Sequence, residues 1–210
     1  MKLTGAWFEK GSAQRILSLF AGRGHQAFFV GGCVRNDQLG FDIDDIDIAT
    51  DATPMQTINL AKNEGLQFFP TGIDHGTITI ILNRQLFEVT TFRKDILTDG
   101  RHASVAFLGN IQEDARRRDF TMNALYADKN GVILDPLNGF KDLHEKRVRF
   151  IGDANKRIKE DYIRILRFFR FSAWYSDPKT GFDTDTLNAI TQNLQGLQKL
   201  SRERISVEII

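Results

Sequence analysis

Two aspartates, Asp45 and Asp47, are the residues of this chain whose type and spacing best suit chemistry. Ile46 separates them in the run DDIDIAT, and alternating isoleucines predict one strand from Ile43 to Ala49. Successive side chains of a strand point to opposite faces, so the two carboxylates share a face. Paired carboxylates bind hard divalent cations. A charged, solvent-facing edge strand is the competing interpretation.

A glycine turn lies a short way before these acids, in the run FVGGCVR over residues 29–35. A buried strand over 27–30 is expected to end at Gly31 and Gly32, and a short helix is expected to follow. Backbone N–H groups of such a turn can hold phosphate oxygens, and Arg35 would add charge-assisted hydrogen bonds. A plain tight turn is the alternative, and the nearby acids favour phosphate binding.

Arg118 ends a run of three arginines in RRRDFTMNAL, over residues 116–125. The apolar residues that follow indicate that this segment packs, so an arginine at its edge can reach a phosphate or a sugar. Asp119 is expected to accept from a hydroxyl group or to orient Arg118. A solvated helix face is the competing interpretation.

A second arginine row occurs in EDYIRILRFFRF, where Arg164, Arg167 and Arg170 recur at every third residue. In the helix predicted over 154–175, neighbouring arginines touch and apolar residues flank them on both sides. Half-buried guanidinium groups need partners, and Asp161 is expected to supply one to Arg164. A structural ion-pair row is the alternative.

The elements around these motifs predict an α+β chain. Strands and helices mix in the first two-thirds, including a hairpin over 77–92 that turns at Asn83 and Arg84, and a helix over 112–123. Residues 94–109 are polar and predict a mobile loop. Only helices are expected later, which places a domain boundary between 1–145 and 146–210.

Composition narrows the class of protein. The chain has 210 residues, of which 41% are hydrophobic and 26% charged, typical of a globular protein with a real core. The net charge of +1 means that any RNA binding must come from a local patch. A single cysteine excludes disulfides and a cysteine-based zinc site, and with no signal-like or membrane-length apolar run we expect a cytoplasmic protein.

Together these motifs resemble the class II tRNA nucleotidyltransferase/poly(A) polymerase family, which includes the CCA-adding enzymes. The matching runs, in the family's order, are GGCVR with DIDIAT, EVTTFR, DGRH, RRDFTMNAL and EDYIRILRFFRF. The resemblance implies a polymerase β-like nucleotidyltransferase head with a mixed sheet over 1–145, then an all-helical neck over 146–210. Members carry further body and tail domains that grip tRNA, so the chain is expected to be a fragment truncated before them.

The resemblance also assigns roles to residues. Asp45 and Asp47 match magnesium ligands, and Asp161 and Arg164 match the pair that reads the Watson–Crick edge of ATP or CTP. Further matches to nucleotide-contacting residues are Gly32, Arg35, Arg118, Arg167 and Arg170. Glu88 is a candidate third carboxylate. Two departures are Asn36 where the family has aspartate, and Asp44 where a basic residue is common.

The implied reaction is addition of C, C and A from CTP and ATP to the 3′ end of tRNA, with two magnesium ions and release of pyrophosphate. Within the family, a poly(A) polymerase and a CC- or A-adding enzyme are the alternatives. The long 94–109 segment favours competence for A addition, and the absence of extra basic segments disfavours a poly(A) polymerase. Two alternatives from outside the family are a non-catalytic RNA-binding relic and a small-molecule nucleotidyltransferase. The oligomeric state is left open.

Overall fold

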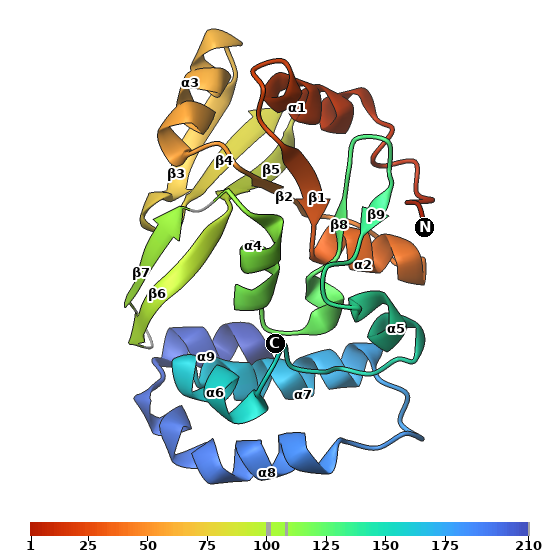
Figure 1. Ribbon diagram of the computed structural model, residues 1–210, viewed down its shortest axis with the longest axis vertical. Coiled ribbons are helices and arrows are strands. Elements are labelled where there is room, and N and C mark those ends of the chain that lie inside the picture. The colour runs from red at the N-terminus through yellow and green to blue at the C-terminus, as the bar shows by residue number, and fades with distance from the viewer. Residues whose placement is uncertain (100–101, 108, 210) are drawn as a thin grey trace.

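The chain folds as a mixed sheet above a layer of helices, in a computed structural model that describes residues 1–99, 102–107 and 109–209 (Figure 1). The main sheet has the strand order β3-β4-β5-β2-β1-β8-β9, and β2 and β5 run parallel. Its strands are β1 (Ala27–Val30), β2 (Ile46–Thr50), β3 (Gln67–Gly72), β4 (Thr77–Leu82), β5 (Gln85–Thr91), β8 (Tyr126–Ala127) and β9 (Ile133–Leu134). The expected α+β class is confirmed.

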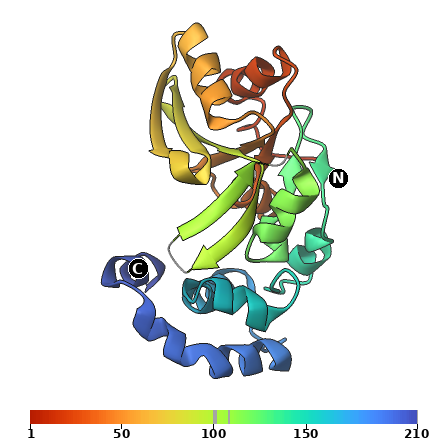
Figure 2. The same ribbon diagram turned by 60° about the vertical axis from the view of Figure 1, so that its left-hand side comes forward.

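The helices fall into two groups: some pack against the sheet, and others form a separate layer below it. Those that accompany the sheet are α1 (Gly11–Ala21), α2 (Gly32–Leu39), α3 (Pro54–Asn63), α4 (Ile111–Arg117) and α5 (Gly139–His144). Those of the lower layer are α6 (Ala154–Glu160), α7 (Ile163–Tyr175), α8 (Thr184–Asn193) and α9 (Arg202–Ile209). In both views the lower helices lie at the end of the molecule opposite α1 and α3 (Figures 1 and 2).

The predicted hairpin is confirmed, and local chemistry explains two further elements. The 77–92 hairpin turns at Asn83 and Arg84, both with left-handed φ values of 52° and 64°. Helix α3 begins with a capping box, in which the side chain and backbone of Thr53 exchange hydrogen bonds with Gln56. Strand β2 buries Ile46 and Ile48 on one face of the sheet. The side chain of Asp47, between them, therefore points to the opposite face.

Two predictions near the acids and on the polar loop need correction. Strand β2 begins at Ile46, so Asp45 lies directly before the strand rather than within it. The loop predicted over 94–109 is wrong, because β6 (Arg93–Asp99) and β7 (His102–Phe107) form an antiparallel hairpin. Residues 100, 101 and 108 lie outside the described residues, and the expected mobility stays a prediction.

Two predicted helices are interrupted. The 154–175 helix is two helices, α6 and α7, because Asp161 has an extended backbone with φ −157° and ψ 109°. The 112–123 helix ends at Arg117, and a short 3₁₀ turn, η2 (Thr121–Asn123), follows. In both cases apolar packing continues past the break, which explains the longer prediction.

An aromatic cluster joins the sheet-bearing part to the lower helices. The ring of Phe120 lies 4.9 Å from that of Phe150 and 5.1 Å from that of Phe171 in α7. The boundary between 145 and 146 stays a prediction. Within the described residues, no helix is long and apolar enough to cross a membrane.

Candidate active site

The acid at the centre of the site is Asp47, in the middle of the sheet. Strands β2 and β5 place it in register with Glu88, and Asp45 lies just before the strand. Burial raises the pKa of Asp47 to about 6; the charge of Arg118 opposes this shift, while the charges of Glu88 and Asp45 add to it. Three carboxylates therefore share one region, and a cation there would relieve their repulsion.

Gly31 brings Arg118 close to that acid. Its φ of +71° is one that glycine adopts at little cost. A Cβ at this position would lie 3.4 Å from Arg118 Nη1 and 3.9 Å from Asp47 Oδ2. A guanidinium and a carboxylate therefore both lie close to this turn.

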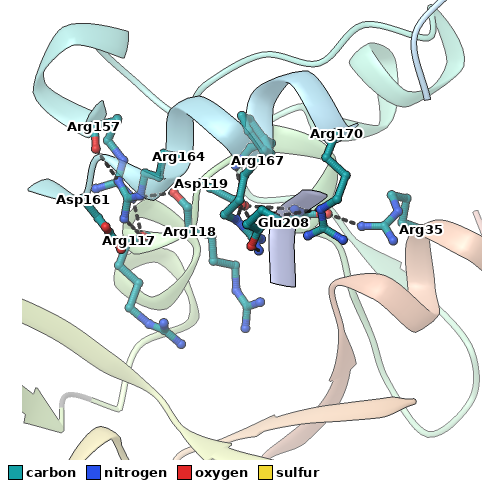
Figure 3. Close-up of polar contacts among 12 residues, drawn as sticks. Arg35, Arg117, Arg118, Asp119, Arg157, Asp161, Arg164, Arg167, Arg170 and Glu208 are labelled. Atoms are coloured by element: carbon teal, nitrogen blue, oxygen red, sulfur yellow. Dashed lines mark hydrogen bonds and ion pairs between the residues drawn. The ribbon is translucent and has the colours of Figure 1, made fainter. Parts of the chain in front are cut away.

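Two buried side chains bind the guanidinium of Arg118. Its guanidinium donates to Asp114 Oδ2 and to the hydroxyl of Tyr126, at 3.1 Å each. In Figure 3 its side chain points away from α7, beside that of Arg117. Asp119 bonds to Asn123 and Arg167, so the expectation that it orients Arg118 is wrong, and its expected bond to a hydroxyl group stays a prediction.

Arg35 joins the glycine helix α2 to helix α7. Its side chain is 7% exposed and donates to Asn123, Asn36 and the hydroxyl of Tyr175. The guanidinium also lies 4.3 Å from the centre of the Tyr175 ring, and burial lowers its pKa. The structure therefore gives Arg35 a packing role, and its predicted contact with nucleotide stays a prediction. Gly32, at the start of α2, lies against it.

A cleft of about 620 Å³ opens between α4, α7 and α9. It brings together four of the predicted residues: Arg118, Asp161, Arg164 and Arg167. Helix α9 lines it with further charged groups, which the sequence motifs did not assign to the site: Glu203, Arg204 and Glu208.

The expected pair of Asp161 and Arg164 is not formed. Asp161 accepts from Arg204 at 2.6 Å, and Arg164 donates to Glu160 at 2.8 Å and to the carbonyl of Arg157 at 3.1 Å. The helix break explains this, because Asp161 does not share the helical spacing on which the expected pair depended.

The next arginines of the row are also paired (Figure 3). Arg167 donates twice to Asp119, at 2.8 and 2.6 Å, and once to Glu208 at 3.3 Å. Arg170 donates to Glu208 at 2.8 Å. Burial opposes ionisation of Asp119, but Arg167 and Asn123 outweigh it and lower the pKa. The row is thus an ion-pair network that faces a cleft.

The motif analysis missed several residues of this network. Glu160 could have been found, since it stands four residues before Arg164 and such spacing pairs charges on one helix face. Asp114 carried the same signal, because it stands three and four residues before Arg117 and Arg118. Tyr126 and Glu208 lack a comparable signal, because a turn or a long separation brings them to their partners.

Asp45 and Asp47 fit a magnesium ion that binds together with a triphosphate. Within the described residues, no group of three or more His, Cys, Asp or Glu side chains is arranged to hold a metal. Magnesium commonly uses one or two carboxylates plus substrate phosphates and water, so two acids suffice. Burial and the nearby Glu88 and Asp45 raise the pKa of Asp47, so a bound cation would stabilise its ionised form.

Comparison with known proteins agrees with this geometry. Residues 27–149 match the family described as the poly A polymerase head domain. The chain is 45% identical over 195 residues to the mitochondrial CCA tRNA nucleotidyltransferase 1 of Mus musculus, covering 92% of this chain and 45% of the relative.

Two solved structures share the fold. One is the Bacillus stearothermophilus CCA-adding enzyme in complex with CTP: TM-score 0.83, 36% identity, 94% of this chain and 46% of that one. The other is a tRNA nucleotidyltransferase complexed with a primer tRNA and an incoming ATP analog: TM-score 0.71, 27% identity, 93% of this chain and 54% of that one. The chain thus spans about half the length of these proteins.

Proposed function

The chain belongs to the poly(A) polymerase head-domain family, and from that premise we propose that it transfers C, C and A from CTP and ATP to the 3′ end of tRNA. The observation that carries the proposal is that Asp47 and Arg118 both lie close to Gly31, with Glu88 in register with Asp47 on the next strand. Carboxylates for a cation and a guanidinium for phosphate are what transfer from a nucleoside triphosphate requires. The names of its relatives, CCA-adding enzymes, support the specific reaction.

The chemical step is an in-line displacement. The 3′ oxygen of the RNA forms a bond to the α-phosphorus, the bond from that phosphorus to the bridging oxygen breaks, and pyrophosphate leaves. Asp45 and Asp47 would hold magnesium, which supplies charge neutralisation and activation of the attacking hydroxyl when bound. Arg118, whose Nη1 lies close to Gly31, would bind the triphosphate and offset its negative charge.

Base selection falls to the cleft. Arg164 carries planar donors and Asp161 carries acceptors, and such groups can match the edge of cytosine or adenine. Each now has a protein partner, Glu160 for Arg164 and Arg204 for Asp161. We propose that an incoming base exchanges these partners, and that two arrangements of the same side chains accept the two bases.

The proposal is tested by incubating the protein with tRNA that lacks its 3′ CCA and with each labelled triphosphate separately. Incorporation from CTP, followed by a single A once ATP is added, is the expected result. Long extension by ATP alone would indicate a poly(A) polymerase instead. No incorporation together with no binding of CTP would indicate an RNA-binding relic. The cytoplasmic location stays a prediction, because the mouse relative is mitochondrial.

A further inference from the structure

We infer that Asp114 and Tyr126 act together as the anchor that positions Arg118, leaving one end of its guanidinium for the phosphates of the incoming nucleotide. The inference rests on the proposed function, and it assigns a positioning role to two residues that do not themselves face the cleft. Both are fully buried, with 0% exposure.

The anchor is a closed set of hydrogen bonds. The Tyr126 hydroxyl donates to Asp114 Oδ2 at 2.6 Å and accepts from Arg118 Nε at 3.1 Å. Arg118 also donates to the same Asp114 oxygen, from Nη2 at 3.1 Å and from Nε at 3.3 Å. The three side chains thus fix one another through the Nε and Nη2 atoms of the guanidinium.

This arrangement decides which end of Arg118 is available. Nε and Nη2 are used by the anchor, and none of the described side chains accepts from Nη1. Nη1 is the atom 3.4 Å from the position of a Cβ on Gly31, on the side of Asp47. An anion at the glycine turn would therefore meet Nη1 with the rest of the group already held.

The charge of Asp114 is shared with a second arginine. Arg117 donates to Oδ1 at 2.8 Å, so the two carboxylate oxygens each hold one guanidinium. Asp114 alone would let Arg118 pivot about Oδ2. The Tyr126 hydroxyl supplies the second fixed point, since it contacts both Asp114 and Arg118. The hydroxyl of Tyr126 is therefore the sharpest place to test the anchor.

The test uses Tyr126→Phe, which keeps the buried ring and removes only the hydroxyl. CTP and cytidine are titrated into the unchanged chain, Tyr126→Phe, Arg118→Gln and the double variant, with binding followed by NMR. We expect Tyr126→Phe to weaken CTP binding about fivefold, and to leave cytidine binding unchanged because cytidine has no phosphate. In the Arg118→Gln background, Tyr126→Phe should cause no additional loss.

Asp37→Asn serves as the control for general destabilisation. Asp37 is also buried, at 6% exposure, but it accepts from Thr4, Gly5 and Trp7 at the N-terminal segment. This variant should melt at a lower temperature and bind CTP normally.

The possible outcomes distinguish failure of the proposed function from failure of the anchor alone. If the unchanged chain binds no CTP, the proposed function and the anchor both fail. If it binds CTP and Tyr126→Phe binds equally well, only the anchor fails. The anchor is also overturned if Tyr126→Phe weakens cytidine as much as CTP, or if it adds a further loss to Arg118→Gln.

Discussion

Asp47 in β2 and Asp114 in α4 both interact with Arg118, but their pKa values are shifted in opposite directions. Burial raises the pKa of Asp47 to about 6, with the charges of Glu88 and Asp45 adding to it. Burial also opposes ionisation of Asp114, but Arg118, Arg117 and Tyr126 outweigh it and lower the pKa to about 2. Burial keeps the pKa of Asp47 raised despite Arg118, while Asp114 has two arginines and a tyrosine hydroxyl as partners that outweigh its burial.

The contrast separates a binding role from a positioning role. A carboxylate that is costly to ionise in the folded protein gains by binding a cation, while one already paired with two arginines gains nothing. Asp47 therefore fits a ligand site, and Asp114 fits a support. Replacing each acid by its amide should have opposite effects on stability and different effects on activity.

The largest expected effect is that of Asp47→Asn on nucleotide addition. Loss of a cation ligand should lower the rate on the order of 10³-fold, measured as incorporation of labelled CTP into tRNA lacking its 3′ end. The fold should survive: in metal-free buffer at pH 7, removal of the repelled charge should raise the free energy of unfolding by about 1–2 kcal/mol. Retained activity would refute the cation role of Asp47.

Asp114→Asn should do the reverse to stability. Breaking a buried ion pair leaves Arg117 and Arg118 with a weaker partner, which costs about 3 kcal/mol and is measurable by denaturant unfolding at pH 7. The pKa of Asp114 is lower in the folded protein than the value near 3.9 of an unfolded chain. The stabilisation by its ion pairs is therefore present above about pH 4 and is lost as the pH falls toward 2. The difference in the free energy of unfolding between the unchanged chain and Asp114→Asn should shrink as the pH falls from about 4 to about 2. A constant difference would show that charge is not its cause.

Arg164→Ala should affect base choice more than chemistry. A good bidentate pair is worth about 1–3 kcal/mol of discrimination, so the preference for CTP over UTP should fall roughly 10- to 100-fold. The measurement compares incorporation of all four triphosphates. Arg15→Ala, at an exposed pair with Glu64 on the other side of the molecule, is the matched control. An unchanged misincorporation profile would remove Arg164 from base reading.

Glu88→Gln should have the smallest effect. Glu88 is exposed and lies in register with Asp47, so its charge adds to the attraction for a cation without being its main source. We expect the magnesium concentration for half-maximal activity to rise about threefold. A loss of activity as large as that of Asp47→Asn would indicate that Glu88 binds the cation directly, as Asp47 is proposed to do.

The sequence predicted the fold class and four of the residues that line the cleft, because these depend on local patterns. Alternating isoleucines and paired glycines specify a strand and a turn whatever surrounds them. The same reasoning failed at Asp161, where apolar spacing continues through a break in the helix. Its side chain accepts from the backbone of Ile163 at 3.2 Å, the kind of capping bond that aspartate forms at a helix start.

The partners within the site could not be predicted in the same way. Asp114 reaches Tyr126 across the turn that follows α4, and Glu208 reaches Arg167 from a helix 41 residues away. Such pairs depend on the packing of whole elements, so no local spacing reveals them. The polar hairpin β6–β7 was missed for a related reason, because its composition resembles that of a loop.

Binding of Mn²⁺ in place of magnesium, followed by electron paramagnetic resonance with CTP present, tests the contrast between the two acids most directly. The account predicts that the unchanged chain and Asp114→Asn bind Mn²⁺, while Asp47→Asn loses binding by on the order of 10-fold or more. Equal Mn²⁺ binding by Asp47→Asn and the unchanged chain would contradict the assignment of Asp47 as the cation ligand.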